Sequence, residues 1–149
     1  QPLAQALADD DFARARKAAA DLVAAAQGQP PIKHARWERE QANLARILEQ
    51  MAGATDIGQL RMAFALLSDQ MSVLLETFGR DEAGRVYQLH CPMAFQGRGA
   101  VWLQDKKEAA NPYFGSSMRS CTDRVTPIEE PSGAAPAPQA EKTADETRK

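Results

Sequence analysis

The sequence lacks most of the features that reveal a function at first sight. Its 149 residues include only nine aromatic side chains and two cysteines, and the net charge is -2. Two cysteines exclude a disulfide-dense scaffold, and no apolar run approaches the roughly 18 to 20 residues of a membrane span. A general nucleic-acid binder would normally show a strong basic excess. We therefore expect no membrane insertion and no nucleic-acid partner.

The motifs of common enzymes are also missing. The sequence has no glycine-rich phosphate loop, no GxSxG, no HExxH and no CxxC. It has two histidines, and neither lies at a meaningful spacing from a carboxylate. A Cys–His hydrolase has no family-specific nucleophile motif to support it. We therefore predict that the protein is not an enzyme.

The composition changes near residue 126. Residues 126–149 contain four prolines and only one hydrophobic side chain larger than alanine, that of Ile128. Such a stretch cannot bury enough apolar surface to offset its ordering entropy. We therefore predict a domain over residues 1–125 and a disordered tail or linker over residues 126–149. The tail has five acidic and three basic residues, which leaves the domain without net charge.

Helical periodicity dominates the first half of the sequence. Apolar residues at alternating spacings of three and four predict a helix over residues 57–78: Ile57, Leu60, Phe64, Leu67, Met71, Leu74 and Phe78. An earlier helix is predicted between Trp37 and Met51. Two more are predicted on either side of a break at residues 9–11.

Short loops between these helices predict antiparallel packing. Beyond them we expect a short strand over residues 86–89 and a short helix that begins near Val101 and ends near Ala110. The predicted fold class is therefore all-α, a small antiparallel helical bundle with a short irregular or hairpin-containing C-terminal lobe.

The lobe contains two pairs of sulfur-bearing residues. A residue before proline favours an extended backbone, which would point Cys91 and Met93 to the same side. The spacing of Met118 and Cys121 places both on one face of a helical turn. Thiolate and thioether ligands select Cu(I), and by the same softness Ag(I). His90 adds a possible imidazole ligand beside them.

The residue pattern leaves other interpretations open. A Cys91–Cys121 disulfide would close a loop of about 30 residues and stabilise the fold by roughly 3 to 4 kcal/mol, as is common in oxidising compartments. The two cysteines can instead be unrelated buried thiols, with the methionines as plain packing. Zn²⁺ on His90, Cys91 and Cys121 is a less favoured metal, because structural zinc sites usually have four ligands.

Several short runs in this region resemble a known bacterial domain of once-unknown function. They are His90-Cys91-Pro92-Met93-Ala94, Gly99-Ala100-Val101-Trp102-Leu103, Asn111-Pro112-Tyr113-Phe114-Gly115, and then Met118 and Cys121. The Asp-rich break at residues 9–11 and the Arg61-x-x-Phe64-x-x-Leu67-Ser68 stretch are similar too. The resemblance covers about residues 3–125. That domain occurs as a small secreted protein and at the C-terminus of periplasmic adaptor subunits of heavy-metal RND efflux pumps, which export copper and silver.

The resemblance implies a periplasmic domain that binds Cu(I) or Ag(I) as a chaperone, buffer or accessory to heavy-metal efflux. It implies RND pump components as partners. The ligands that it implies are Cys91, Met93, Met118 and Cys121, with His90 as a fifth candidate. Two positions depart from the family pattern. Arg119 stands where an apolar residue is usual, and Thr122 where a glycine is usual. The alternative function is a disulfide-stapled structural or interaction domain of an envelope complex without a metal site. The oligomeric state does not follow from the sequence.

Overall fold

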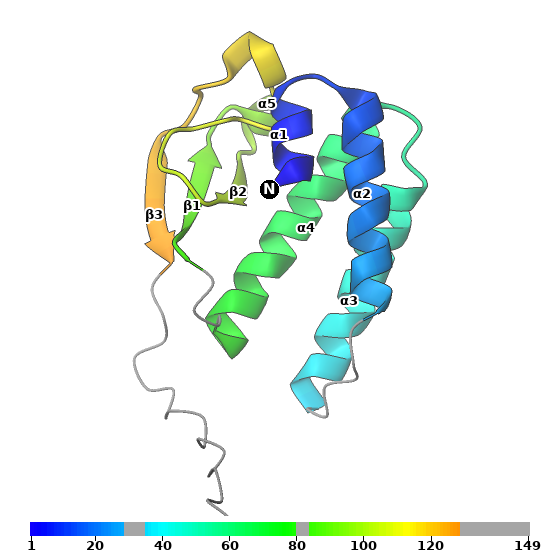
Figure 1. Ribbon diagram of the computed structural model, residues 1–149. Coiled ribbons are helices and arrows are strands. Elements are labelled where there is room, and N and C mark those ends of the chain that lie inside the picture. The colour runs from blue at the N-terminus through cyan, green and yellow to red at the C-terminus, as the bar shows by residue number, and fades with distance from the viewer. Residues whose placement is uncertain (29–34, 80–83, 129–149) are drawn as a thin grey trace, which may run out of the picture.

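The computed structural model describes residues 1–28, 35–79 and 84–128 (Figure 1). The helices are α1 (Pro2–Ala8), α2 (Phe12–Gln27), α3 (Ala35–Ala52), α4 (Ile57–Phe78), the short α5 (Ala94–Gly97) and the 3-10 helix η1 (Gly115–Met118). The strands are β1 (Val86–Cys91), β2 (Ala100–Gln104) and β3 (Arg124–Ile128). We call residues 84–128 the C-terminal lobe. None of the described helices is long and apolar enough to cross a membrane.

The all-α prediction was wrong, because the lobe contains a three-stranded antiparallel sheet. The strand order is β2-β1-β3, and the fold is mixed α/β with a helical N-terminal part. The short helix predicted from about Val101 to Ala110 begins instead as strand β2. Pairing with β1 decides this conformation, since Trp102 lies opposite Leu89 and both side chains are fully buried.

The helical predictions for the first half are confirmed. Helix α4 begins after Asp56, whose side chain accepts a hydrogen bond from the Gln59 N–H at 2.8 Å. It ends at Gly79, which has the positive φ of 72° that glycine tolerates. Asp11 caps α2 by accepting from the Arg14 N–H at 3.0 Å. These local signals explain why the helix bounds followed from the sequence.

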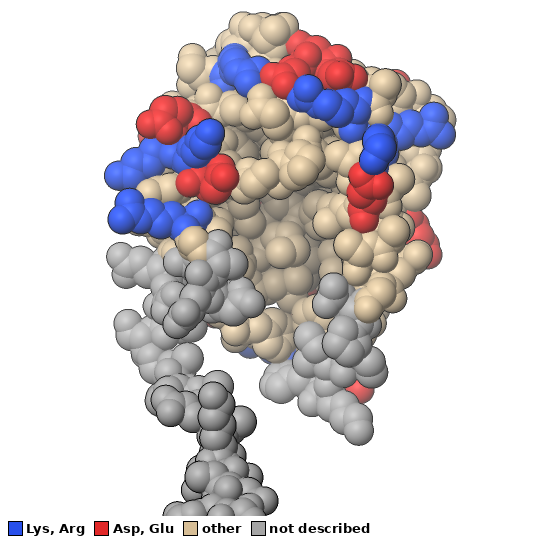
Figure 2. Space-filling view, in the orientation of Figure 1, with Lys and Arg blue, Asp and Glu red and all other residues tan. Residues whose placement is uncertain are grey.

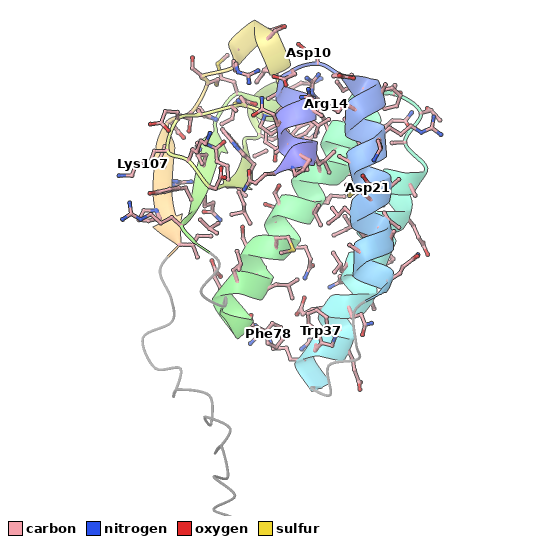
Figure 3. All side chains as sticks on the ribbon, viewed as in Figure 1. Asp10, Arg14, Asp21, Trp37, Phe78 and Lys107 are labelled. Atoms are coloured by element: carbon pink, nitrogen blue, oxygen red, sulfur yellow. The ribbon has the colours of Figure 1, made fainter. Side chains whose placement is uncertain are left out.

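Helix α4 is the central element of the molecule. The sheet lies on one side of it and α3 lies on the other, while α1 lies in front of its upper part and α2 runs in front of α3 (Figure 1). The buried stripe of α4 meets buried apolar residues of α1, α2 and α3, among them Leu7, Ala15 and Met51. At the far end, the rings of Trp37 on α3 and Phe78 on α4 meet edge to face, 5.7 Å apart (Figure 3). The same core continues into the lobe.

The strand β1 separates its side chains onto two faces. Tyr87, Leu89 and Cys91 are buried, while Gln88 and His90 alternate with them on the other face. The second face looks toward α4, because Gln88 Nε2 donates to Ser72 Oγ on that helix at 2.9 Å. Alternation along a strand therefore sends neighbouring residues His90 and Cys91 in opposite directions.

The third strand, β3, extends into the predicted tail. It pairs with β1 along its length and ends at Ile128, so residues 126–128 belong to the sheet. The remainder of the predicted tail, residues 129–149, lies outside the described residues.

Candidate metal centre

The two cysteines meet in the lobe. Cys91 is the last residue of β1 and is fully buried, and its Sγ lies 3.1 Å from the Sγ of Cys121. Both are free thiols in the structure, and the Cys121 side chain is partly exposed. One sulfur is therefore fixed in the sheet, while the other lies at the edge of the core.

A buried asparagine holds the turn that carries Cys121. The Asn111 amide donates to the Cys121 carbonyl at 2.8 Å, and its oxygen accepts from the N–H groups of Tyr113 and Phe114. Asn111 is fully buried, so these bonds are shielded from water. The sequence marked Asn111-Pro112 as a break, but its role in placing Cys121 was missed. The available signal was an asparagine before a proline, because asparagine side chains often accept a hydrogen bond from the backbone two residues further along the chain.

The environment of Cys121 favours its protonated thiol. The hydrogen bond with Cys91 raises the pKa of Cys121, and burial and the nearby Cys91 charge add to that effect. The backbone N–H of Met93 opposes it by donating to the Cys121 sulfur. Since the thiolate is the nucleophile and the metal ligand, the pair must lose protons before it can bind an ion.

The two methionines lie on the chain segments that surround Cys121. The Cys121 N–H donates to the Met118 carbonyl at 3.0 Å, so the turn between them is helical in type. Met93 differs from its prediction, because its backbone is in the right-handed helical region (φ −93°, ψ −10°) and the extended run ends at Cys91. Its side chain is 54% exposed. Met93 therefore approaches Cys121 through its backbone, with its thioether at the surface.

His90 lies apart from the two thiols. It points to the opposite face of β1, where its Nδ1 lies 2.7 Å from Oδ1 of Asp123. This contact with His90 lowers the pKa of Asp123. On its other side, Gly99 leaves room for the ring, since a Cβ there would lie 2.6 Å from Nε2. Within residues 1–28, 35–79 and 84–128, no three His, Cys, Asp or Glu side chains converge on a possible ion.

A polar network fixes the lobe on the helices. Arg61 of α4 donates to the carbonyls of Pro112 (2.8 Å) and Leu7 (2.9 Å), and it forms an ion pair with Asp10 (2.6 Å). Asp10 also accepts from the N–H and the hydroxyl of Ser116, at 2.8 and 2.6 Å. This network was not predicted, because its partners lie up to 106 residues apart in the chain.

A second set of bonds lies beside this network. Arg119 of the lobe donates to Asp9 at 2.7 Å, and Arg14 of α2 contacts the same carboxylate. Asp10 and Arg14 lie at the α1–α2 connection in Figure 3, and Figure 2 shows acidic and basic side chains gathered at that end of the visible face. Arg119 thus has a structural role away from the thiols.

Comparison with known proteins places the chain in a family. The model of a family of proteins of unknown function, DUF3347, matches residues 2–83. The match therefore includes helices α1 to α4 and ends before β1. No curated protein and no solved structure matches the chain. Because the match spans more than half of the 149 residues, the chain belongs to the DUF3347 family.

Proposed function

We propose that this chain is a periplasmic domain that binds Cu(I) or Ag(I) as a chaperone, buffer or accessory to heavy-metal efflux. The observation that most supports the proposal is the 3.1 Å separation of the Cys91 and Cys121 sulfurs. Two converging thiols of this kind are soft ligands, which favour Cu(I) over Mg²⁺, Ca²⁺ or Mn²⁺. The periplasmic location and the RND pump partners rest on the resemblance of the sequence motifs.

The thiol pair fits a metal ion after a small movement. With metal–sulfur bonds of about 2.3 Å, two sulfurs on one ion lie about 3.7 Å apart at a tetrahedral angle, and farther apart in a linear arrangement. The pair must therefore open by at least about half an ångström. Cys91 is fully buried in the sheet, so the movement falls to the side chain of Cys121, which is partly exposed.

The structure supports the three remaining candidate ligands, Met93, Met118 and His90, to different extents. Met93 lies two residues after Cys91 and Met118 lies three residues before Cys121, and both supply thioethers that match the same soft ions. The exposed Met93 offers the more accessible sulfur for taking an ion from a donor. His90 is left out of the proposed ligand set, because it faces Asp123 on the other side of β1.

The test is an anaerobic Cu(I) titration of fully reduced protein against a Cu(I)-specific chromogenic chelator. We expect about one Cu(I) per chain, and none in the variant that combines Cys91→Ser and Cys121→Ser. Met93→Leu should weaken the affinity. Met62→Leu is its matched control, because Met62 is equally exposed (53%) but lies on α4. Reduced protein that fails to compete with the chelator contradicts the proposal.

Proton release gives an independent readout of the same site. The raised pKa of Cys121 keeps its proton on at neutral pH, so the ion must displace it. If both thiols deprotonate on binding, the apparent affinity should rise by up to about a hundredfold per pH unit below the thiol pKa values. An affinity that does not change with pH would exclude thiolate ligands.

The same distance supports a second candidate, a disulfide-stapled structural or interaction domain. Sulfurs 3.1 Å apart are close enough to form the bond with little movement. Protein isolated without reductant would then contain no free thiol. If it also fails to bind Cu(I) after reduction, the staple is the function of the two cysteines.

A further inference from the structure

The outer side of α4 has an apolar stripe that no described element covers. Met62, Leu66, Asp69 and Val73 are spaced 4, 3 and 4 residues apart, which places them in one line along the helix. The exposed fractions of the three apolar side chains are 53%, 47% and 39%. We call these four residues the outer stripe. Neighbouring exposed apolar side chains of this size indicate an interaction surface.

A groove lies on each side of the outer stripe. Toward the sheet, a groove of about 610 Å³ is lined by Phe95, Val101 and Arg98, among others. Toward α3, a groove of about 390 Å³ is lined by Ile47 and Arg46, among others. Leu66 and Asp69 line both grooves, so they form the ridge between them. Figure 1 shows the corresponding arrangement, with α4 between the sheet and α3.

The charges on this face are complementary to one another. Asp69 interrupts the apolar stripe, and burial raises the pKa of its carboxyl. Among the described residues, no ion pair involves Asp69. The groove walls carry the opposite charge, with Arg46 on one side and Arg98 and Arg124 on the other. The face thus has an acidic ridge and basic grooves.

We propose that this face of α4 is an interface between two copies of the chain related by a twofold axis. A ridge that is flanked by grooves packs against its own copy by placing each ridge into a groove of the other, as in helix-to-helix packing. The twofold axis makes every contact occur twice. Each Asp69 then enters a groove whose rim carries the other copy's arginines, which gives an exposed carboxylate that has no ion pair among the described residues a cation to face. The complementarity of one face with itself selects a second copy as the occupant.

The first test is sedimentation of the metal-free, reduced protein over a range of concentrations, so that no shared metal ion joins the chains. We expect the mass to shift from monomer to dimer as the concentration rises. Leu66→Asp should weaken dimerisation by at least about tenfold. Leu22→Asp is the matched control, since Leu22 is also exposed (36%) but lies on α2. It should dimerise as the unmodified chain does, and circular dichroism confirms that both variants fold.

The second test addresses the charges. Asp69→Arg should weaken the dimer, because it brings a cation among the partner's arginines. Adding Arg46→Glu, Arg98→Glu or Arg124→Glu to that variant should restore it, and the restoring partner identifies which groove receives the ridge. Restoration by none of the three overturns the proposed pairing. An unmodified chain that stays monomeric at every concentration overturns the proposal.

Discussion

At the scale of single residues, Gly115 shows how closely the lobe approaches the α1–α2 connection. A Cβ at this position would lie 2.0 Å from Oδ1 of Asp10, and φ is +57°. Asp10 cannot move aside freely, because Arg61 and Ser116 hold its carboxylate. Gly115→Ala should therefore lower the free energy of unfolding by about 2 to 4 kcal/mol, from backbone strain and lost hydrogen bonds. Urea denaturation measures the change.

A second glycine, Gly97, separates the effect of backbone strain from the effect of the lost hydrogen bonds. Gly97 also has a positive φ, +83°, but a Cβ there would meet nothing within 4 Å. Gly97→Ala should cost only the strain of the left-handed backbone, about 1 kcal/mol. If Gly115→Ala is no more destabilising than Gly97→Ala, the close contact with Asp10 is not present in solution.

The carboxylate of Asp10 also predicts how stability depends on pH. Hydrogen bonds from the Ser116 hydroxyl and N–H, together with Arg61, hold the pKa of Asp10 well below its ordinary value of 3.8. A folded-state pKa below the unfolded value means that the carboxylate stabilises the fold above the unfolded value. This contribution is lost as the pH falls toward the folded pKa.

Asp10→Asn tests this effect, because the amide keeps the shape of the side chain but has no charge to lose; the hydrogen bond that its NH2 group cannot accept adds a loss that does not depend on pH. The variant should melt at a lower temperature than the unmodified chain at neutral pH. The difference should shrink as the pH falls below about 4. Thermal unfolding over a pH series measures it, and a difference that stays constant into acid would show that the charge does not contribute.

At the scale of elements, the helices and the strand that begins at Val86 were predictable, and the other two strands were not. The bounds of α4 followed from local signals, namely the apolar spacing and the caps at Asp56 and Gly79. Strand β2 depends on a distant partner, and its short apolar run around Trp102 fits a helix equally well. Strand β3 is exposed along nearly its whole length, so it has no alternating pattern to detect.

The candidate site was predictable to a similar extent. The proximity of Cys91 and Cys121 was among the predicted arrangements, because both a disulfide and a shared ion require it. The position of His90 was not predicted, because the expected strand ended at residue 89. The observed strand continues to Cys91. Because neighbouring side chains of a strand point to opposite faces, this extension places His90 on the face away from the thiols. The placement of His90 beside Asp123 is thus a consequence of the longer strand.

Arg61 connects α4 to three other parts of the fold, so its substitution should change the stability of the protein. Its guanidinium bonds α1 through the Leu7 carbonyl, the α1–α2 connection through Asp10 and the lobe through the Pro112 carbonyl. A lysine cannot reproduce a fork of donors that reaches all three. Arg61→Lys should therefore destabilise the fold by about 2 kcal/mol in urea denaturation. Arg16→Lys, on the exposed side of α2, should change it by no more than about 0.5 kcal/mol.

At the scale of the whole molecule, the matched region and the lobe form one folding unit. The family match ends at residue 83, yet the core passes through that boundary. The ring of Phe64 on α4 lies 6.1 Å from that of Tyr113, which lies 6.0 Å from Trp102 on β2. Arg61 and Asp10 likewise have partners among residues 112–116. Removing the lobe would expose one side of α4 and leave both charged groups without these partners.

Truncation tests this unity. A chain of residues 1–83 should retain helical circular dichroism but lose the cooperative thermal transition of the full chain, because buried aromatic contacts and the Arg61 network are absent. A chain of residues 1–128 is the matched control and should melt like the full chain, because it keeps all three strands and every contact of Arg61 and Asp10 described above. A cooperative transition of residues 1–83 at an unchanged temperature would instead make the lobe an independent attachment. The thiol pair would then be carried on a separate unit, and Gly115→Ala would no longer be expected to destabilise the helices.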